Sequence, residues 1–267
     1  MTGPDFDAVV TRLRAAGCVF AEDEAELLVS AARDRRELEA MVRRRVDGQP
    51  LEHVIGFAEF CGLTVLVDPG VFVPRRRSEF LVGQAAKLTP VRGIAIDLCC
   101  GSGALGLALA AAVELAGLHS VDVDPAAVRC AHRNVAATQP PAHSSASLRV
   151  YLGDLYEPLP DSLRGRVDVL LANVPYVPTG EVPFLPAEAR EYEARVALDG
   201  GADGLDVLRR VAGGAAHWLV PGGHLLIEIS ERQVPAAEAA FASAGLRPAV
   251  VSSEELGATL IVGGSPA

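Results

Sequence analysis

The stretch Ile94-Ala95-Ile96-Asp97-Leu98-Cys99-Cys100-Gly101-Ser102-Gly103 decides the fold of this 267-residue chain. Its apolar first half is typical of a buried strand, and its glycines predict a tight turn that lets the backbone approach a ligand closely. An apolar run begins at Ala104, so the turn leads into a helix whose N-terminal N–H groups can face an anion. Such a strand, turn and helix predict an α/β domain that binds a small molecule at the carboxyl edge of its sheet.

Strands and helices alternate from this stretch to the C-terminus. We expect strands at 94–98, 118–123, 148–152, 167–172, 223–229, 247–252 and 258–262, and helices at 104–115, 125–137, 204–219 and 231–244. This alternation predicts a doubly wound, mainly parallel sheet of seven strands in an α/β fold. Because no helix separates the last two strands, we expect one of them to be antiparallel.

The N-terminal part of the chain follows a different pattern. Apolar residues recur with a period close to 3.6 through residues 4–46, which predicts helices. Residues 57–67 are typical of a β-hairpin that turns near Gly62. We therefore expect an N-terminal helical domain at 1–56, a β-hairpin linker at 57–76 and the α/β domain at 77–267.

A second informative stretch, Asn173-Val174-Pro175-Tyr176, follows the strand expected at 167–172. It is similar to the Asn-Pro-Pro-Tyr motif of amino-methyltransferases, with Val174 in place of the first proline. The strand and glycine turn at 94–103 are similar to the motif with which such enzymes hold S-adenosyl-L-methionine. Together the two stretches resemble the signatures of an enzyme that methylates a planar nitrogen.

Acidic residues at successive strand ends would complete the S-adenosyl-L-methionine site. Asp97 is placed to orient the methionyl amine. Asp122, about 20 residues beyond the glycines, can accept both ribose hydroxyls, and Asp124 is a rival for this role. Asp154 can accept a hydrogen bond from the adenine amino group, and Leu155 can pack against the adenine ring. The other residues that we expect at the cofactor are Cys99, Gly101, Gly103 and Asn173.

The tetrapeptide supplies groups that an amide nitrogen needs in order to react. Such a nitrogen is a poor nucleophile because its lone pair is delocalised, so an enzyme helps by orienting it and accepting its N–H bonds. We expect the side-chain oxygen of Asn173 and the carbonyl of Val174 to be the two acceptors. Tyr176 can stack on the planar amide, and Pro175 stiffens the loop.

Further blocks extend the resemblance over almost the whole chain: Phe72-Val73-Pro74-Arg75 and residues 48–56, 199–206 and 221–229. With the two motifs, they resemble the HemK/PrmC family of protein-glutamine N5-methyltransferases. The resemblance implies a Rossmann-like methyltransferase sheet and an N-terminal substrate-binding domain. It also implies methylation of the glutamine in the Gly-Gly-Gln motif of peptide chain release factors, with Arg75 beside the substrate. Cys99 replaces the family's first loop glycine, which is tolerable if its φ is negative.

Composition restricts the partners. The net charge of −10 disfavours a protein that grips nucleic acid through its phosphates, because such proteins are usually basic. Scattered cysteines and dispersed histidines give neither a disulfide framework nor metal-ligand spacing, so we expect no metal. The chain has no signal pattern and no apolar stretch of membrane-spanning length. We expect a cytoplasmic monomer that does not bind membranes.

Three alternatives stay open. The target can be a glutamine of a ribosomal protein or of another protein. The tetrapeptide also fits an adenine-N6 DNA methyltransferase, because adenine presents a planar amino group when it is flipped out of the duplex. Finally, Val174 and Cys99 suggest a cofactor-binding protein whose catalysis is weakened.

Overall fold

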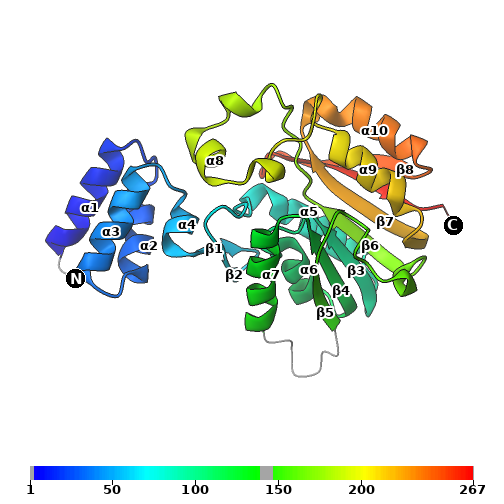
Figure 1. Cartoon of the computed structure of the whole chain (residues 1–267), viewed down its shortest axis with the longest axis horizontal. Helices are drawn as coiled ribbons and strands as arrows, with labels where there is room; N and C mark the ends of the chain where they lie inside the picture. The colour runs from blue at the N-terminus through cyan, green and yellow to red at the C-terminus, as the bar shows by residue number, and fades with distance from the viewer. Residues whose placement is uncertain (1–2, 139–146, 267) are drawn as a thin grey trace.

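A computed structural model describes residues 3–138 and 147–266 (Figure 1). The N-terminal helices are α1 (Gly3–Ala15), α2 (Ala21–Ala31), α3 (Arg35–Val46) and α4 (Leu51–Ile55). They enclose an apolar cluster of their own around Leu13, Leu28 and Val42. Asp34 caps α3, because its side chain accepts a hydrogen bond from the Glu37 N–H at 2.8 Å. These helices lie at one end of the molecule and the large sheet at the other.

A short hairpin follows the helices. Its strands are β1 (Phe57–Phe60) and β2 (Leu63–Leu66), which pair antiparallel. The turn consists of Cys61 and Gly62, both with positive φ, as a type I′ hairpin turn requires. The hairpin expected near Gly62 is therefore present. The chain then passes through a 3-10 turn at Arg76–Ser78 into α5 (Glu79–Leu88). The division at residues 56 and 76 into domains and linker stays a prediction.

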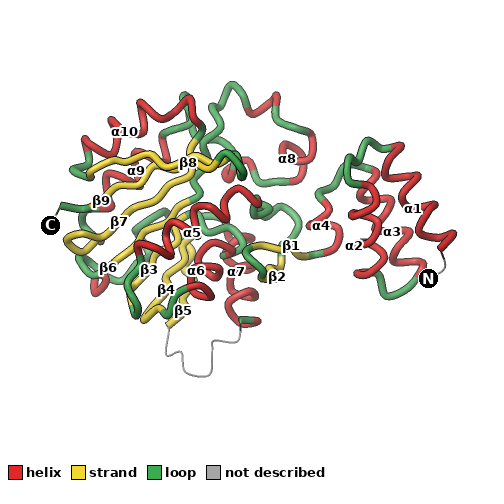
Figure 2. Tube along the Cα trace, turned by 180° about the vertical axis from the view of Figure 1, so that it is seen from behind, coloured by secondary structure: helices red, strands yellow, loops and turns green. Residues whose placement is uncertain are grey.

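The main sheet has the order β5-β4-β3-β6-β7-β9-β8, and Figure 2 shows these strands side by side. They are β3 (Gly93–Leu98), β4 (Leu115–Asp122), β5 (Ser147–Leu152), β6 (Val167–Ala172), β7 (Leu219–Ile229), β8 (Arg247–Ser253) and β9 (Ala258–Gly264). Strands β3 to β7 pair parallel, whereas β9 is antiparallel to both β7 and β8. This confirms the mainly parallel, seven-stranded fold predicted from the sequence.

Helices cover both faces of the sheet. They are α5, α6 (Ala104–Ala112), α7 (Pro125–Ala137), α9 (Asp206–Ala215) and α10 (Val234–Ser243). Helix α8 (Ala187–Tyr192) has no buried residue and lies in the segment that follows β6. Ile96 of β3 joins the apolar cluster that includes Leu208 of α9 and Phe241 of α10. Its neighbour Ala95 joins the opposite cluster, with residues of α5 and α6. The alternation of side chains along β3 thus buries both faces, as parallel strands in such sheets require.

Two helices are shorter than the sequence pattern predicts. Helix α6 ends at Ala112, and β4 begins at Leu115, because Leu115 is buried and pairs with Gly93 of β3. Likewise, α9 ends at Ala215, because Leu219 already belongs to β7. In both places an apolar run contains a helix end and a strand start that periodicity cannot separate. No described helix has the length and apolar composition to cross a membrane.

The sheet order brings the informative loops together. Strand β3 lies between β4 and β6, although β6 is three strands later in the chain than β3. The chain after β3 and the chain after β6 therefore lead toward opposite edges of the sheet, and a crevice forms at such a switch point. The glycine turn after β3, Asp122 at the end of β4 and the tetrapeptide after β6 all meet at this edge.

Candidate active site

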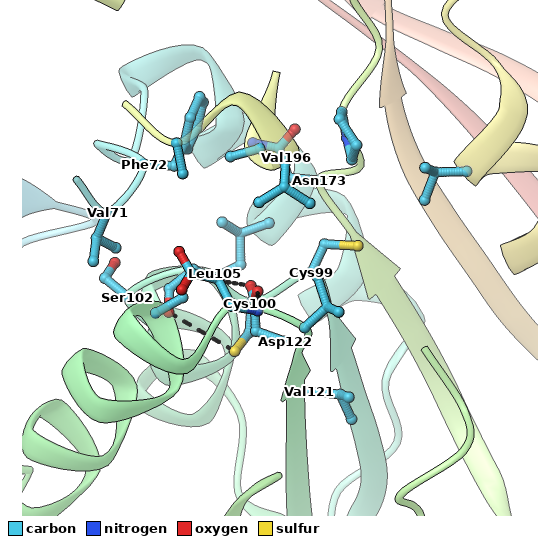
Figure 3. A pocket seen from close by; sticks show the side chains of 18 of the residues that line it. Val71, Phe72, Cys99, Cys100, Ser102, Leu105, Val121, Asp122, Asn173 and Val196 are labelled. Atoms are coloured by element: carbon cyan, nitrogen blue, oxygen red, sulfur yellow. Dashed lines mark hydrogen bonds between the residues drawn. The ribbon is translucent and has the colours of Figure 1, made fainter. Parts of the chain in front are cut away.

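The carboxyl edge of the sheet carries a cavity of about 240 Å³ (Figure 3). Of the predicted site residues, those that line it are Cys99, Gly101, Asp122, Asp154, Leu155, Asn173 and Pro175. Those that lie outside its lining are Asp97, Gly103, Val174, Tyr176 and Arg75. Among the described residues, no group of His, Cys, Asp and Glu side chains could hold a metal ion. The cavity joins the glycine turn, the strand-end acids and the tetrapeptide in one place.

Asp122 fixes the glycine turn from the end of β4. Its Oδ2 accepts from the Gly101 N–H at 2.8 Å, and its Oδ1 accepts from the Asp124 N–H at 2.9 Å. Burial raises the pKa of Asp122, whereas these backbone bonds lower it. The rival, Asp124, also lines the cavity, but its Oδ1 caps α7 by accepting from the Ala126 N–H at 2.8 Å. Asp122 is therefore the acid that couples the turn to the cavity wall.

Asp97 is a buried acid with an unused oxygen. The residue is 1% exposed, and its Oδ2 accepts from the Gly106 N–H at 2.9 Å. Its Oδ1 is buried, and no described residue hydrogen-bonds to it. Burial raises the pKa of Asp97 to about 7; the Gly106 bond opposes this shift, and the charge of Asp122 adds to it. Because buried polar atoms normally have partners, the free oxygen indicates a place for a donor or cation.

The raised pKa of Asp97 makes stability depend on pH. Its folded value of about 7 lies above the ordinary value of 3.8, so between these values the folded chain holds a proton that the unfolded chain has lost. The contribution of Asp97 to the unfolding free energy is therefore present at low pH and falls as pH rises toward 7. An asparagine side chain cannot titrate, so the Asp97→Asn protein should gain stability relative to wild type as pH rises. Urea unfolding of both proteins at about pH 5 and about pH 8 measures this, and an equal difference at both values would contradict it.

The turn after β3 contains left-handed backbone at Cys99 (φ 55°), Gly101 (φ 55°) and Gly103 (φ 81°). The negative φ under which cysteine replaces glycine without strain is therefore absent at Cys99. The Cys100 N–H donates to the carbonyl of Val121 on β4 at 3.0 Å, which turns the chain at residue 99. This conformation costs a non-glycine residue about 1–2 kcal/mol. Burial raises the pKa of the Cys99 thiol, so the side chain is a neutral packing group on the cavity wall.

An ion pair lies at the part of the wall expected to meet adenine. Asp154 and Arg210 both line the cavity, and Nη2 of Arg210 donates to Oδ2 of Asp154 at 2.6 Å. Leu155, 8% exposed and with φ 49°, lines the cavity beside them. Arg210 was missed from the sequence, because it lies on α9 within an ordinary amphipathic pattern. Its partner is 56 residues away, so no local signal reveals it.

The tetrapeptide turns its residues in different directions. Asn173 and Pro175 line the cavity, and no described residue hydrogen-bonds to the Asn173 side chain. The side chain of Val174 is 1% exposed and packs in the main apolar cluster with Leu205. Tyr176 lies outside the cavity lining, and its carbonyl accepts from Nε2 of Gln233 at 2.9 Å. The structure thus places an uncommitted amide at the cavity and anchors the residues that follow it.

A glycine-rich loop, residues 200–204, packs against the backbone of the tetrapeptide and braces it. The Gly200 N–H donates to the Val177 carbonyl at 2.8 Å, and the Thr179 N–H donates to the Gly201 carbonyl at 2.8 Å. Gly204 has φ 78°, and a Cβ at this position would collide with the Tyr176 carbonyl oxygen. Gly200 and Gly204 are therefore required, because a Cβ on either would collide with a carbonyl oxygen of the tetrapeptide, that of Pro175 or of Tyr176.

Gly204→Ala should displace Tyr176 and lower kcat by about 100-fold, because a shift of about 1 Å at a reacting group can have that effect. Gly222→Ala is the matched control: Gly222 has the same φ of 78°, and its Cβ would meet nothing within 4 Å. Both variants suffer similar backbone strain, but only Gly204→Ala disturbs the tetrapeptide. Steady-state methylation rates at matched folded concentrations measure the difference, and equal losses in the two variants would disprove the bracing role.

The linker ahead of α5 and the loop after the tetrapeptide form another wall of the cavity, where Figure 3 shows Phe72 and Val196 across from Asp122. The wall consists of Val71, Phe72, Pro74, Ala194, Val196 and Ala197. Arg75 fastens the two segments, because its Nη2 donates to Oε1 of the buried Glu193 at 2.6 Å. The substrate contact expected of Arg75 stays a prediction. The wall was not identified from the sequence, because its apolar residues look like ordinary core.

The fold and the cavity together define a class. A crystal structure of a methyltransferase from Pyrococcus furiosus shares the fold with a TM-score of 0.56 and 16% identity, over 77% of this chain and 90% of that chain. The family described as "Methyltransferase small domain" matches residues 62–188. The chain therefore has a methyltransferase fold.

Relatives at higher identity define the family. The chain is 35% identical to the release factor glutamine methyltransferase of Geobacter sulfurreducens, over 84% of this chain and 76% of that protein. It is also 35% identical to a 4-amino-L-phenylalanine/4-methylamino-L-phenylalanine methyltransferase of Streptomyces pristinaespiralis, over 76% of this chain and 69% of that protein. The chain belongs to the release factor glutamine methyltransferase family, which the sequence resemblance predicted.

Proposed function

We propose that this protein transfers a methyl group from S-adenosyl-L-methionine to the side-chain N5 of the glutamine in the Gly-Gly-Gln motif of a peptide chain release factor. One observation carries the proposal: Asn173 lines the cavity, and no described residue uses its amide. An amide in that state can accept an N–H bond of a substrate amide. Family membership supports the choice of target. Release factors act on ribosomes, so the proposal includes a cytoplasmic location.

The residues around the cavity fit S-adenosyl-L-methionine, which supplies an electrophilic methyl group on a sulfonium. The partnerless Oδ1 of Asp97 suits the methionyl ammonium, and Asp122 retains acceptor capacity for ribose hydroxyls. Apart from the neighbouring residues in the chain, a Cβ on Gly101 would meet no described atom within 4 Å, so the turn leaves open space in front of its backbone. Asp154 and Leu155 complete the set at the end expected to hold adenine.

The tetrapeptide would orient the glutamine. The side-chain oxygen of Asn173 and the carbonyl of Val174 accept the two N–H bonds of the amide and turn its nitrogen toward the cavity. The buried Val174 side chain fixes that carbonyl by packing in the core, which replaces the rigidity that a proline would give. Tyr176 packs against the planar amide and excludes water. The chain's own contribution is thus orientation and acceptor placement.

The deciding experiment is mass spectrometry of a purified class-1 release factor after incubation with this protein and S-adenosyl-L-methionine. The expected result is a gain of one methylene on the Gly-Gly-Gln glutamine that is absent with the Asn173→Ala protein. Parallel reactions contain ribosomal proteins, duplex DNA and 4-amino-L-phenylalanine as acceptors. If one of these acceptors is methylated and the release factor is not, that acceptor replaces the release factor as the substrate.

A protein with weakened catalysis would give a different pattern. It would bind S-adenosyl-L-methionine by calorimetry but would transfer no methyl group to any of these acceptors. That result would favour the interpretation in which Val174 and Cys99 have reduced activity. The monomeric state expected from the sequence stays a prediction.

A further inference from the structure

Tyr176 is held at both ends by residues outside the tetrapeptide. Its hydroxyl accepts a hydrogen bond from Nη2 of Arg77, and the guanidinium carbon lies 5.8 Å from the centroid of the Tyr176 ring. Its carbonyl accepts from Nε2 of Gln233 at 2.9 Å. Gln233 also donates to the carbonyl of Asp203 at 3.2 Å, in the glycine-rich loop. These contacts fix the backbone of Tyr176 and the direction of its ring separately.

Arg77 is itself fixed by a buried carboxylate. Its Nε donates to Oε1 of Glu228 at 2.6 Å, and Oγ of Ser78 donates to Oε2 of the same carboxylate at 2.6 Å. Glu228 is 2% exposed and Ser78 is fully buried. Both carboxylate oxygens are therefore engaged, and Glu228 is rigidly placed on β7, next to the strand that carries the tetrapeptide. The guanidinium is thereby held in one orientation.

We propose that Arg77, held by the Glu228 carboxylate that Ser78 fixes in turn, is a positioning residue that sets the orientation of the Tyr176 ring against the substrate amide. This inference rests on the proposed function. A guanidinium has donors in a planar fork, so Arg77 can donate through Nε to Glu228 and through Nη2 to Tyr176 at the same time. A lysine ammonium on a flexible stem can keep the charge pair with Glu228 but does not reproduce this fork.

A purely stabilising ion pair is the competing explanation. Glu228 is buried, so removing Arg77 would leave its carboxylate without a cation, and an Arg77→Ala protein could lose activity simply by unfolding. The two explanations differ in the hydroxyl of Tyr176. If Arg77 acts through that hydroxyl, deleting it removes the same link as changing Arg77. If Arg77 only neutralises Glu228, the effect of changing Arg77 on the rate does not depend on the Tyr176 hydroxyl.

The test is a double-mutant cycle of Arg77→Lys, Tyr176→Phe and the two changes combined. Each single change should lower kcat by about 10-fold, with little change in KM for the release factor, because ring orientation affects the reacting geometry more than docking. The combined protein should lose no more than either single one, because both changes break one link. Arg76→Lys, at the exposed neighbouring arginine, is the matched control and should keep the wild-type rate.

Thermal unfolding and calorimetry with S-adenosyl-L-methionine show that the variants are folded and bind the cofactor. Losses that multiply in the combined protein would overturn the inference, as would a wild-type rate in Arg77→Lys. Both outcomes leave the proposed function intact, because the wild-type protein still methylates the release factor in the same assay. A wild-type protein that does not methylate it would overturn the proposed function, and the positioning role with it.

Discussion

Replacing Asn173 by alanine should lower kcat for glutamine methylation by about 100-fold or more, which corresponds to about 3 kcal/mol on the barrier. The side chain lines the cavity, and no described residue hydrogen-bonds to it, so its oxygen is available to a substrate. Alanine removes this acceptor and leaves one N–H of the glutamine amide unpaired in a site that excludes water. The nitrogen then loses the orientation that its reaction requires.

Single-turnover methylation of the release factor measures this loss directly, because it separates chemistry from product release. Asn173→Asp is the matched control: it has the same size and keeps an acceptor oxygen in the same place, so it should lose less than the alanine protein. Calorimetry with S-adenosyl-L-methionine determines whether the loss lies in cofactor binding. Equal rates for the aspartate and alanine proteins would contradict the acceptor role of Asn173.

The parts of the structure that could be predicted from sequence are those with a local cause. The run 94–103 predicts strand, turn and helix because apolar residues and glycines follow one another in a fixed order. The hairpin turn at Gly62 has an equally local signal, a glycine between two short apolar runs. The antiparallel strand β9 could be predicted because no helix precedes it. Asp122 and Asn173 could be placed at one edge because both follow predicted parallel strands.

The parts that could not be predicted depend on contacts between distant segments. Glu228 reaches Arg77 across 151 positions, and Arg75 reaches Glu193 across 118, so neither pair leaves a pattern in any short window. The left-handed backbone at Cys99 was missed for the same reason, since it follows from a hydrogen bond between the turn and β4. The tetrapeptide was recognised from sequence, but the burial of the Val174 side chain depends on an apolar cluster that includes distant residues such as Leu205.

The cofactor end of the cavity gives the second large effect: Asp122→Asn should weaken the binding of S-adenosyl-L-methionine by about 10- to 100-fold. Both carboxylate oxygens of Asp122 accept backbone N–H bonds, one from Gly101 and one from Asp124. An asparagine has one acceptor oxygen, so its NH₂ group must face one of these N–H donors. The cofactor thereby loses an acceptor, and a ribose hydroxyl left unpaired in the site costs about 1–3 kcal/mol of binding free energy, of which each 1.4 kcal/mol is tenfold in affinity. The turn at Gly101 would shift, and one acceptor for the ribose would be lost.

Asp124→Asn separates this effect from a general loss of charge at the end of β4. Asp124 caps α7, and asparagine caps helices about as well as aspartate, so this protein should bind the cofactor with nearly wild-type affinity. Titration calorimetry with S-adenosyl-L-methionine, at matched salt, compares the two variants. If both bind equally weakly, the negative charge near the cavity matters more than the two hydrogen bonds of Asp122. If only Asp122→Asn is weakened, the acid that holds the glycine turn is also the acid that holds the cofactor.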